Sequence, residues 1–225
     1  ENILAVKVTE TTPTSVNLDR MSLYSYFPLA GIIRKVSLIS VPDIHLKSLQ
    51  SYTVWDKDYR NVNLKIQTAL VNLNQINQAK LNLEVRVTDL KGTKIIAQEI
   101  TSAISLPAWG RTGYELTLPV KNPRPWTAEI PELYLLTIQL KSGGKLIQEL
   151  VTRIGFRQTE IKGTEILING RPVKFSGVCH HDSHPLMGRA ITPELEKQDL
   201  ELIKEANLNS VRTSHYPPIP EFLDY

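Results

Sequence analysis

The chain has 225 residues, 41% of them hydrophobic, and can therefore bury a substantial core in one or two domains. Its 26 basic and 23 acidic residues give a net charge of +3 and are spread without long runs, which argues against a nucleic-acid partner and against a basic membrane-binding face. No apolar run approaches the ~20 residues of a membrane-spanning helix, so we expect no membrane partner.

The cysteine usage and the first residues leave the compartment open. Cys179 is the single cysteine and cannot form an internal disulfide, and no Cys/His spacing resembles a structural zinc site. Residues 1–8 lack the basic start, apolar centre and cleavage site of a signal peptide. Both cytoplasm and periplasm remain compatible with the sequence, and any targeting signal is expected upstream.

Residues 1–44 contain two strand-like runs, at 3–8 and 30–39, joined by a polar loop that carries Tyr24, Tyr26 and Phe27. Two strands alone would leave edges and an apolar face exposed. We therefore expect these runs to complete a sheet whose other strands lie outside the chain.

Residues 45–157 show the period-two alternation of half-buried strands. The alternating apolar residues are Val62, Leu64 and Ile66; Leu81, Leu83, Val85 and Val87; Tyr114, Leu116, Leu118 and Val120; and Tyr134, Leu136, Ile138 and Leu140. Glycines at 92, 143 and 144 mark turns between runs. The pattern predicts an antiparallel sandwich of roughly a hundred residues with a supporting or spacing role.

Residues 158–225 change pattern again. Asn169-Gly170 suits the positive φ angles of a type I′ turn, which predicts a hairpin. Thr192 as N-cap and Pro193 as the first helical residue predict a helix over about 193–207, with Leu202 on its apolar face. A short strand at 210–213 would complete a parallel βαβ unit.

Candidate functional side chains follow the two strands of this unit. His181 and Asp182 lie after the first strand and His215 after the second, so a right-handed crossover brings them to one rim, where a (β/α)₈ barrel builds its active site. Imidazole and carboxylate groups suit a substrate rich in hydroxyls. The simpler interpretation is that these side chains only satisfy loop backbone groups.

Three other features of the sequence each allow two interpretations. His180, His181, Asp182 and His184 are all metal-ligand types, but their spacing matches no known ligand frame, so we predict no metal site here. An arginine in the second strand, Arg212, would need an acidic partner if buried, and a surface ion pair is the alternative. Trp126 is better explained by packing than by stacking on a sugar.

Five motifs in order resemble glycoside hydrolase family 2, the family of β-galactosidases, β-glucuronidases and β-mannosidases. They are NPRPWTAEIPELY at 122–134, IGFR at 154–157, INGRPV at 168–173, GVCHHDSHP at 177–185 and RTSHYP at 212–217. The resemblance implies a mainly β chain with three parts: the last strands of a jelly-roll domain at 1–44, an immunoglobulin-like β-sandwich at 45–157, and the start of a catalytic TIM barrel at 158–225.

The resemblance also implies residue roles. His181 and His215 correspond to sugar-contacting histidines of β-galactosidases, and Arg212 to the arginine that pairs with the nucleophilic glutamate. Asp182 is a further substrate-binding candidate. The motif around it departs from the family pattern, because the family's usual Asn-Arg-His-Glu reads Cys-His-His-Asp at 179–182.

Family 2 enzymes hydrolyse with retention through two glutamates, which the resemblance places beyond Tyr225. The acidic residues of the predicted helix are expected mostly on its solvated side: Glu194, Glu196, Asp199, Glu201 and Glu205. The chain alone is therefore expected to be inactive and to depend on the remainder of a longer polypeptide.

The segment at 184–188 resembles the β-galactosidase version, so a terminal β-galactoside is the expected substrate. A β-glucuronidase or β-mannosidase is one alternative, and a non-catalytic carbohydrate-binding or scaffolding module is another. A divalent metal bound by residues outside this chain is left open, and unpaired edges would favour a homo-oligomer.

Overall fold

The computed structural model describes residues 3–9, 32, 34–214 and 216–225. The chain forms two compact units, one spanning Ile39–Lys174 and the other combining the described residues of Glu1–Leu38 with Phe175–Tyr225. Among the described residues, no helix is long and apolar enough to cross a membrane.

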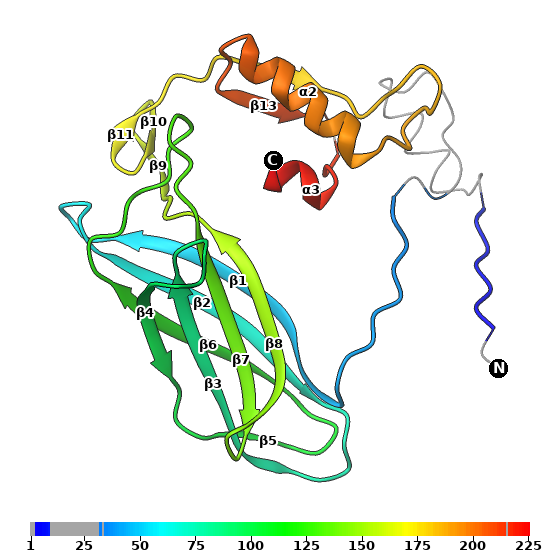
Figure 1. Ribbon diagram of the computed structural model, residues 1–225, viewed down its shortest axis with the longest axis vertical. Coiled ribbons are helices and arrows are strands. Elements are labelled where there is room, and N and C mark those ends of the chain that lie inside the picture. Colours follow the sequence, from blue (N-terminus) through cyan, green and yellow to red (C-terminus); the bar gives the residue numbers. More distant parts are fainter. Residues whose placement is uncertain (1–2, 10–31, 33, 215) are drawn as a thin grey trace. The chain divides into compact units, whose positions relative to one another are not determined.

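The Ile39–Lys174 unit contains a β-sandwich of two antiparallel sheets (Figure 1). One sheet has the order β1 (Ile44–Trp55), β2 (Val62–Asn72), β6 (Arg111–Val120). The other has the order β4 (Ile95–Ile100), β3 (Gln78–Thr88), β7 (Tyr134–Ser142), β8 (Lys145–Ile154), and β5 (Ile104–Leu106) also pairs with β3. This arrangement confirms the predicted mainly β fold with an immunoglobulin-like sandwich.

The core lies between the central strands, and their alternation explains it. Every second residue of β3 from Leu81 to Val87 is fully buried, and the same holds for β7 from Leu136 to Leu140. Burying each such side chain stabilises the fold by about 1.5–3 kcal/mol. The alternation of apolar residues in the sequence is therefore explained by the burial of one face of each strand. The turn between β7 and β8 uses Gly143 and Gly144, both with positive φ.

A small antiparallel sheet follows the sandwich in the same unit. It consists of β9 (Thr159–Lys162), β10 (Glu165–Ile168) and β11 (Arg171–Pro172). Asn169 and Gly170 connect β10 to β11 with φ of 50° and 74°, which confirms the predicted hairpin turn.

The Asn169 side chain ties this hairpin to the sandwich. Its Oδ1 accepts hydrogen bonds from Trp55 Nε1 and from the backbone N–H of Gln158, both at 2.9 Å. Its Nδ2 donates to the backbone oxygen of Trp126 at 2.9 Å. The Arg157 guanidinium stacks over the Trp126 ring, 4.9 Å from the ring centroid. This contact agrees with the expected packing role of the tryptophan.

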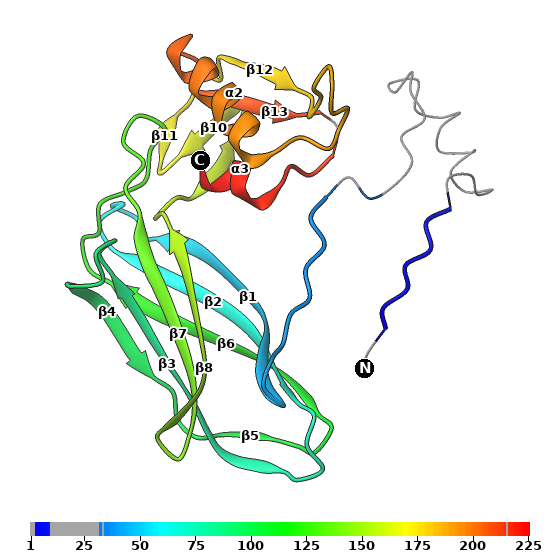
Figure 2. The same cartoon turned by 45° about the vertical axis from the view of Figure 1, so that its right-hand side comes forward.

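The second unit contains the predicted βαβ motif. Strands β12 (Gly177–His180) and β13 (Ser210–Thr213) are parallel, with Cys179 opposite Arg212, and helix α2 (Pro193–Glu205) connects them (Figure 2). Thr192 is the N-cap residue as predicted, but its side chain makes no capping hydrogen bond. A short helix, α3 (Pro220–Asp224), follows.

Two expectations about this unit are wrong. The described residues of the first segment, 3–9, 32 and 34–43, contain no strand, although strands were predicted at 3–8 and 30–39; residues 30, 31 and 33 of the second run lie outside the described residues. A strand needs a hydrogen-bonded neighbour, and the described residues provide none for these runs. In α2, Leu202 is 56% exposed whereas Glu196 is fully buried, the reverse of the expected faces.

Candidate functional site

The C-terminal ends of β12 and β13 are joined by hydrogen bonds just beyond the strands. The backbone N–H of Ser214 donates to the oxygen of His180 at 2.9 Å. The backbone N–H of Asp182 donates to the Tyr216 hydroxyl at 2.8 Å. The two segments that the sequence placed on one rim therefore meet there.

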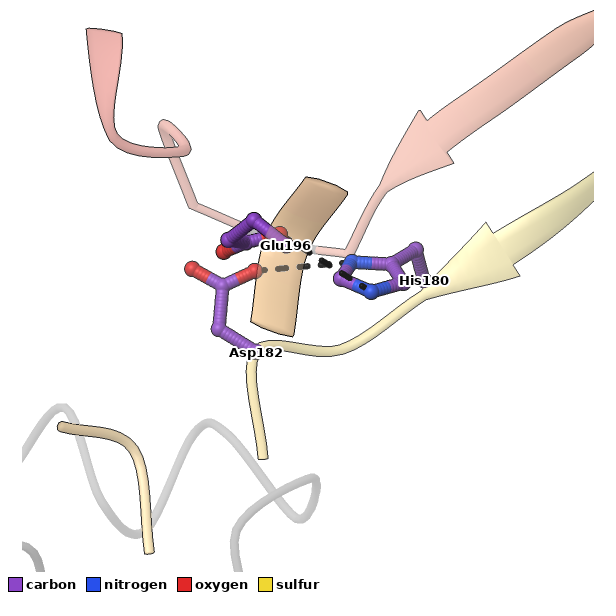
Figure 3. A group of neighbouring side chains, drawn as sticks. All are labelled: His180, Asp182 and Glu196. Carbon is purple, nitrogen blue, oxygen red and sulfur yellow. Dashed lines mark ion pairs between the residues drawn. The ribbon is translucent and has the colours of Figure 1, made fainter. Parts of the chain in front are cut away.

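Behind this rim lies a group of three buried side chains, His180, Asp182 and Glu196, here called the buried cluster (Figure 3). One ligand-type atom of each lies within 4.8 Å of one atom of each of the others. The side chains of these residues are 9%, 1% and 0% exposed. His180 and Asp182 come from the end of β12 and its following loop, and Glu196 comes from the first turn of α2.

The imidazole of His180 is the centre of the cluster. Its Nε2 lies 2.9 Å from Asp199 Oδ2, and its Nδ1 lies 3.5 Å from Asp182 Oδ1. Glu196 Oε2 lies 4.0 Å from Nε2, so Asp199 and not Glu196 is the hydrogen-bond partner of this nitrogen. The ring also packs against Phe222 of α3, with 5.5 Å between centroids.

Glu196 is the least satisfied group of the cluster. Neither carboxylate oxygen has a hydrogen-bond partner, and both are buried. Burial raises the pKa of Glu196, and the nearby Asp182 carboxylate raises it further, while His180 acts in the opposite direction. Isolated burial of a carboxylate is costly, so this side chain calls for a counter-charge or a ligand.

Arg34 supplies part of the compensating charge. Its Nη2 pairs with Asp182 Oδ2, and its Nη1 donates to the backbone oxygen of Arg189 at 3.3 Å. The oxygens of Asp182 are thus divided, one facing Arg34 and the other facing His180. No sequence signal linked Arg34 to Asp182, because the two residues are separated by 148 positions and neither lies in an alternating run.

The predicted site residues fall into different environments. His181 is exposed, and its ring lies 6.2 Å from that of Tyr216. Asp182 is buried behind it. Arg212 is exposed and lines an open hollow of about 450 Å³ with Phe175 and Val178.

His215 lies outside the described residues, so its predicted position beside His181 stays a prediction. The sequence interpretation missed Glu196 as a site residue, because its neighbours in the helix suggested a solvated face.

Comparison with known families identifies the chain. Residues 44–157 match the family description "Glycosyl hydrolases family 2", and residues 159–225 match "Glycosyl hydrolases family 2, TIM barrel domain". The chain belongs to glycosyl hydrolase family 2. In family terms, β12, α2 and β13 lie in the start of the TIM barrel domain.

Curated family 2 relatives include two bacterial β-galactosidases. That of Alteromonas mediterranea is 31% identical over 203 residues, covering 87% of this chain and 19% of the relative. That of Pectobacterium atrosepticum is 33% identical over 225 residues, covering 98% of this chain and 21% of the relative. The chain thus spans about a fifth of the length of these relatives.

Solved family 2 structures of other specificity are also similar. A β-galacturonidase from Eisenbergiella tayi bound to galacturonate superposes with a TM-score of 0.72 at 29% identity, covering 82% of this chain and 31% of that chain. A β-glucuronidase from Bacteroides uniformis superposes with a TM-score of 0.73 at 27% identity, covering 82% of this chain and 23% of that chain.

Proposed function

We propose that the protein containing this chain is a retaining β-glycosidase that hydrolyses terminal non-reducing β-galactosides. The proposal rests mainly on the 31–33% identity to β-galactosidases over most of the chain. An exposed His181 at the C-terminal end of a barrel strand, the usual position of active-site groups in this fold, agrees with it.

In this proposal His181 and His215 contact sugar hydroxyls, and Arg212 orients the catalytic nucleophile. Asp182 is better suited to a positioning role than to the direct sugar contact inferred from the sequence. Its side chain is 1% exposed, and its two oxygens face Arg34 and His180. Its backbone N–H, bonded to Tyr216, fixes the loop that carries His181.

The catalytic carboxylates are proposed to lie in residues of the whole protein that follow Tyr225. A retaining pair stands about 5–5.5 Å apart on either side of the sugar bond. Asp182 and Glu196 are close enough to each other, but both are buried and a sugar cannot enter between them. We therefore propose that the 225 residues alone turn over no glycoside; turnover by the purified chain would contradict this.

The domain assignment remains part of the proposal, with a jelly-roll remainder at 1–44, the sandwich at 45–157 and the barrel start at 158–225. A uronidase is the second candidate function, because solved structures of a β-galacturonidase and a β-glucuronidase resemble this chain. The barrel groups that would bind a sugar carboxylate decide between the two.

The test uses the complete protein encoded by the reading frame that contains this chain. It is assayed with the nitrophenyl β-galactoside, β-glucuronide and β-mannoside, and the anomer of the first product is read by NMR. We expect the galactoside to be preferred with retained configuration. Preference for the glucuronide would favour the second candidate, and hydrolysis of none would reject the enzyme proposal.

The His181→Ala variant tests the residue assignment. Loss of one or two hydrogen bonds to the sugar should lower kcat/KM about 10- to 100-fold. His45→Ala is the matched control, because His45 contacts the oxygen of Pro42 in the sandwich unit and should leave kcat/KM unchanged. Equal activity of both variants would remove His181 from the site.

A further inference from the structure

We propose that His180, Asp182 and Glu196 bind one divalent transition-metal ion between the end of β12 and the first turn of α2. The three residues present two carboxylates and one imidazole within 4.8 Å of one another. This site is separate from the sugar contacts proposed above, because its three side chains are buried whereas His181 is exposed.

The first support is a set of buried polar atoms without partners. Both oxygens of Glu196 and Nδ1 of His180 are buried and make no hydrogen bond. Leaving such atoms unpaired costs about 1–3 kcal/mol each, and more for a charged group. A cation placed among them would satisfy these atoms at once, whereas a proton on Glu196 would satisfy one of its oxygens and leave the other without a partner.

The second support is the arrangement around His180. Asp199 Oδ2 lies 2.9 Å from Nε2 and can accept a hydrogen bond from an N–H at this nitrogen. Nδ1 lies 3.5 Å from Asp182 Oδ1 and makes no hydrogen bond, which leaves it available as a ligand atom. Metal-binding histidines commonly donate their second N–H to a carboxylate in this manner.

The third support is the local charge. The carboxylates of Asp182, Glu196 and Asp199 lie around the His180 imidazole, and Arg34 pairs with Asp182. A divalent cation would offset this excess of acidic groups. One nitrogen and two oxygen donors favour Zn²⁺ or Mn²⁺ over Ca²⁺, which prefers six to eight oxygens.

The geometry requires a modest adjustment. Ligand atoms at about 2.1 Å from a tetrahedral metal lie roughly 3.4 Å apart, so a separation of 4.8 Å would contract by about 1.4 Å. Rotation of the Glu196 side chain provides this movement, since its oxygens are held by no hydrogen bond. Binding would then fasten α2 to the loop that carries His181.

The experiment measures binding of Zn²⁺ and of Mn²⁺ to the complete protein encoded by the reading frame that contains this chain, after removal of bound metal with a chelator. Titration calorimetry should give, for at least one of the two ions, a saturable site that depends on Glu196. Glu196→Gln should weaken it at least about 10-fold, and Asp199→Ala, which removes the hydrogen-bond partner of His180 Nε2, about 10- to 100-fold. Glu201→Gln is the matched control on the exposed part of the same helix and should change affinity less than threefold.

A second measurement needs no variant. Paramagnetic Mn²⁺ added at substoichiometric amounts should broaden the amide resonances of His180, Asp182 and Glu196 before those of the sandwich. Absence of a saturable site below about 1 mM for both ions, a free energy of only about 4 kcal/mol, would overturn the proposal. So would an affinity that Glu196→Gln leaves unchanged, or broadening centred on other residues.

Discussion

Replacement of Asn169 tests how the hairpin is fastened to the sandwich. Its side chain makes three hydrogen bonds of 2.9 Å, to Trp55, Gln158 and Trp126. Each contributes about 1 kcal/mol net, so Asn169→Gly, which tolerates the positive φ, should lower the free energy of unfolding by about 3 kcal/mol. Asn169→Ala should lose about 1 kcal/mol more, because a Cβ disfavours φ of 50°.

Urea unfolding followed by tryptophan fluorescence measures this loss. All three tryptophans, at 55, 109 and 126, lie in the Ile39–Lys174 unit, so the signal reports on that unit alone. With a slope of about 1–3 kcal/mol per molar urea, the midpoint should fall by about 1–3 M.

The matched control is Asn122→Gly. Asn122 is an exposed asparagine that also has positive φ, at 43°, and its replacement should change the unfolding free energy by less than about 0.5 kcal/mol. Equal effects at 122 and 169 would refute the idea that the Asn169 side chain holds the hairpin.

Two further predictions follow from packing and charge. Gly177→Ala would place a Cβ 2.2 Å from the backbone oxygen of Ser210, so we expect β12 and β13 to separate. The backbone amides of these two strands should then lose protection from hydrogen exchange, while those of β3 keep it. Retained protection in β12 and β13 would contradict the close approach. Lys141, and then Arg86, hold the pKa of Glu84 below its ordinary value of 4.5, so Glu84 contributes stability above that pH and loses it as pH falls through the lowered pKa. Glu84→Gln should therefore destabilise the sandwich by about 1–2 kcal/mol near neutral pH, and the difference from the unchanged protein should shrink as pH falls through the lowered pKa. A difference that does not change with falling pH would argue against the ion pairs.

Sequence alternation predicted β2, β3, β6 and β7, because one face of each packs against the core and the other does not. The edge strands β1 and β8 gave no comparable signal. Most residues of β8 are exposed or half-buried, so polar residues occupy positions on both faces. Hydrogen bonding to β7 keeps this strand in the sheet, and that pairing is not visible in its own pattern.

The βαβ unit was predictable from local signals, whereas the buried cluster was not. Thr192, Pro193 and the short strand at 210–213 are local features. The burial of Glu196 depends on His180 from another element, and that of Asp182 depends on Arg34, which is distant in sequence. Helical periodicity alone assigned Glu196 to the solvent-exposed face of α2. The periodicity contains no information on charged side chains that other elements bring close to the helix.

The Asn169 hydrogen bonds also set where the sandwich can be exchanged as a module. Recombination after residue 157 would remove the acceptor of the Trp55 indole and uncover the carbonyl of Trp126. A crossover after Lys174 keeps the hairpin with the sandwich that it contacts. Chimaeras between family members should therefore tolerate exchange at the later boundary, and laboratory shuffling that follows the earlier one should yield poorly folded proteins.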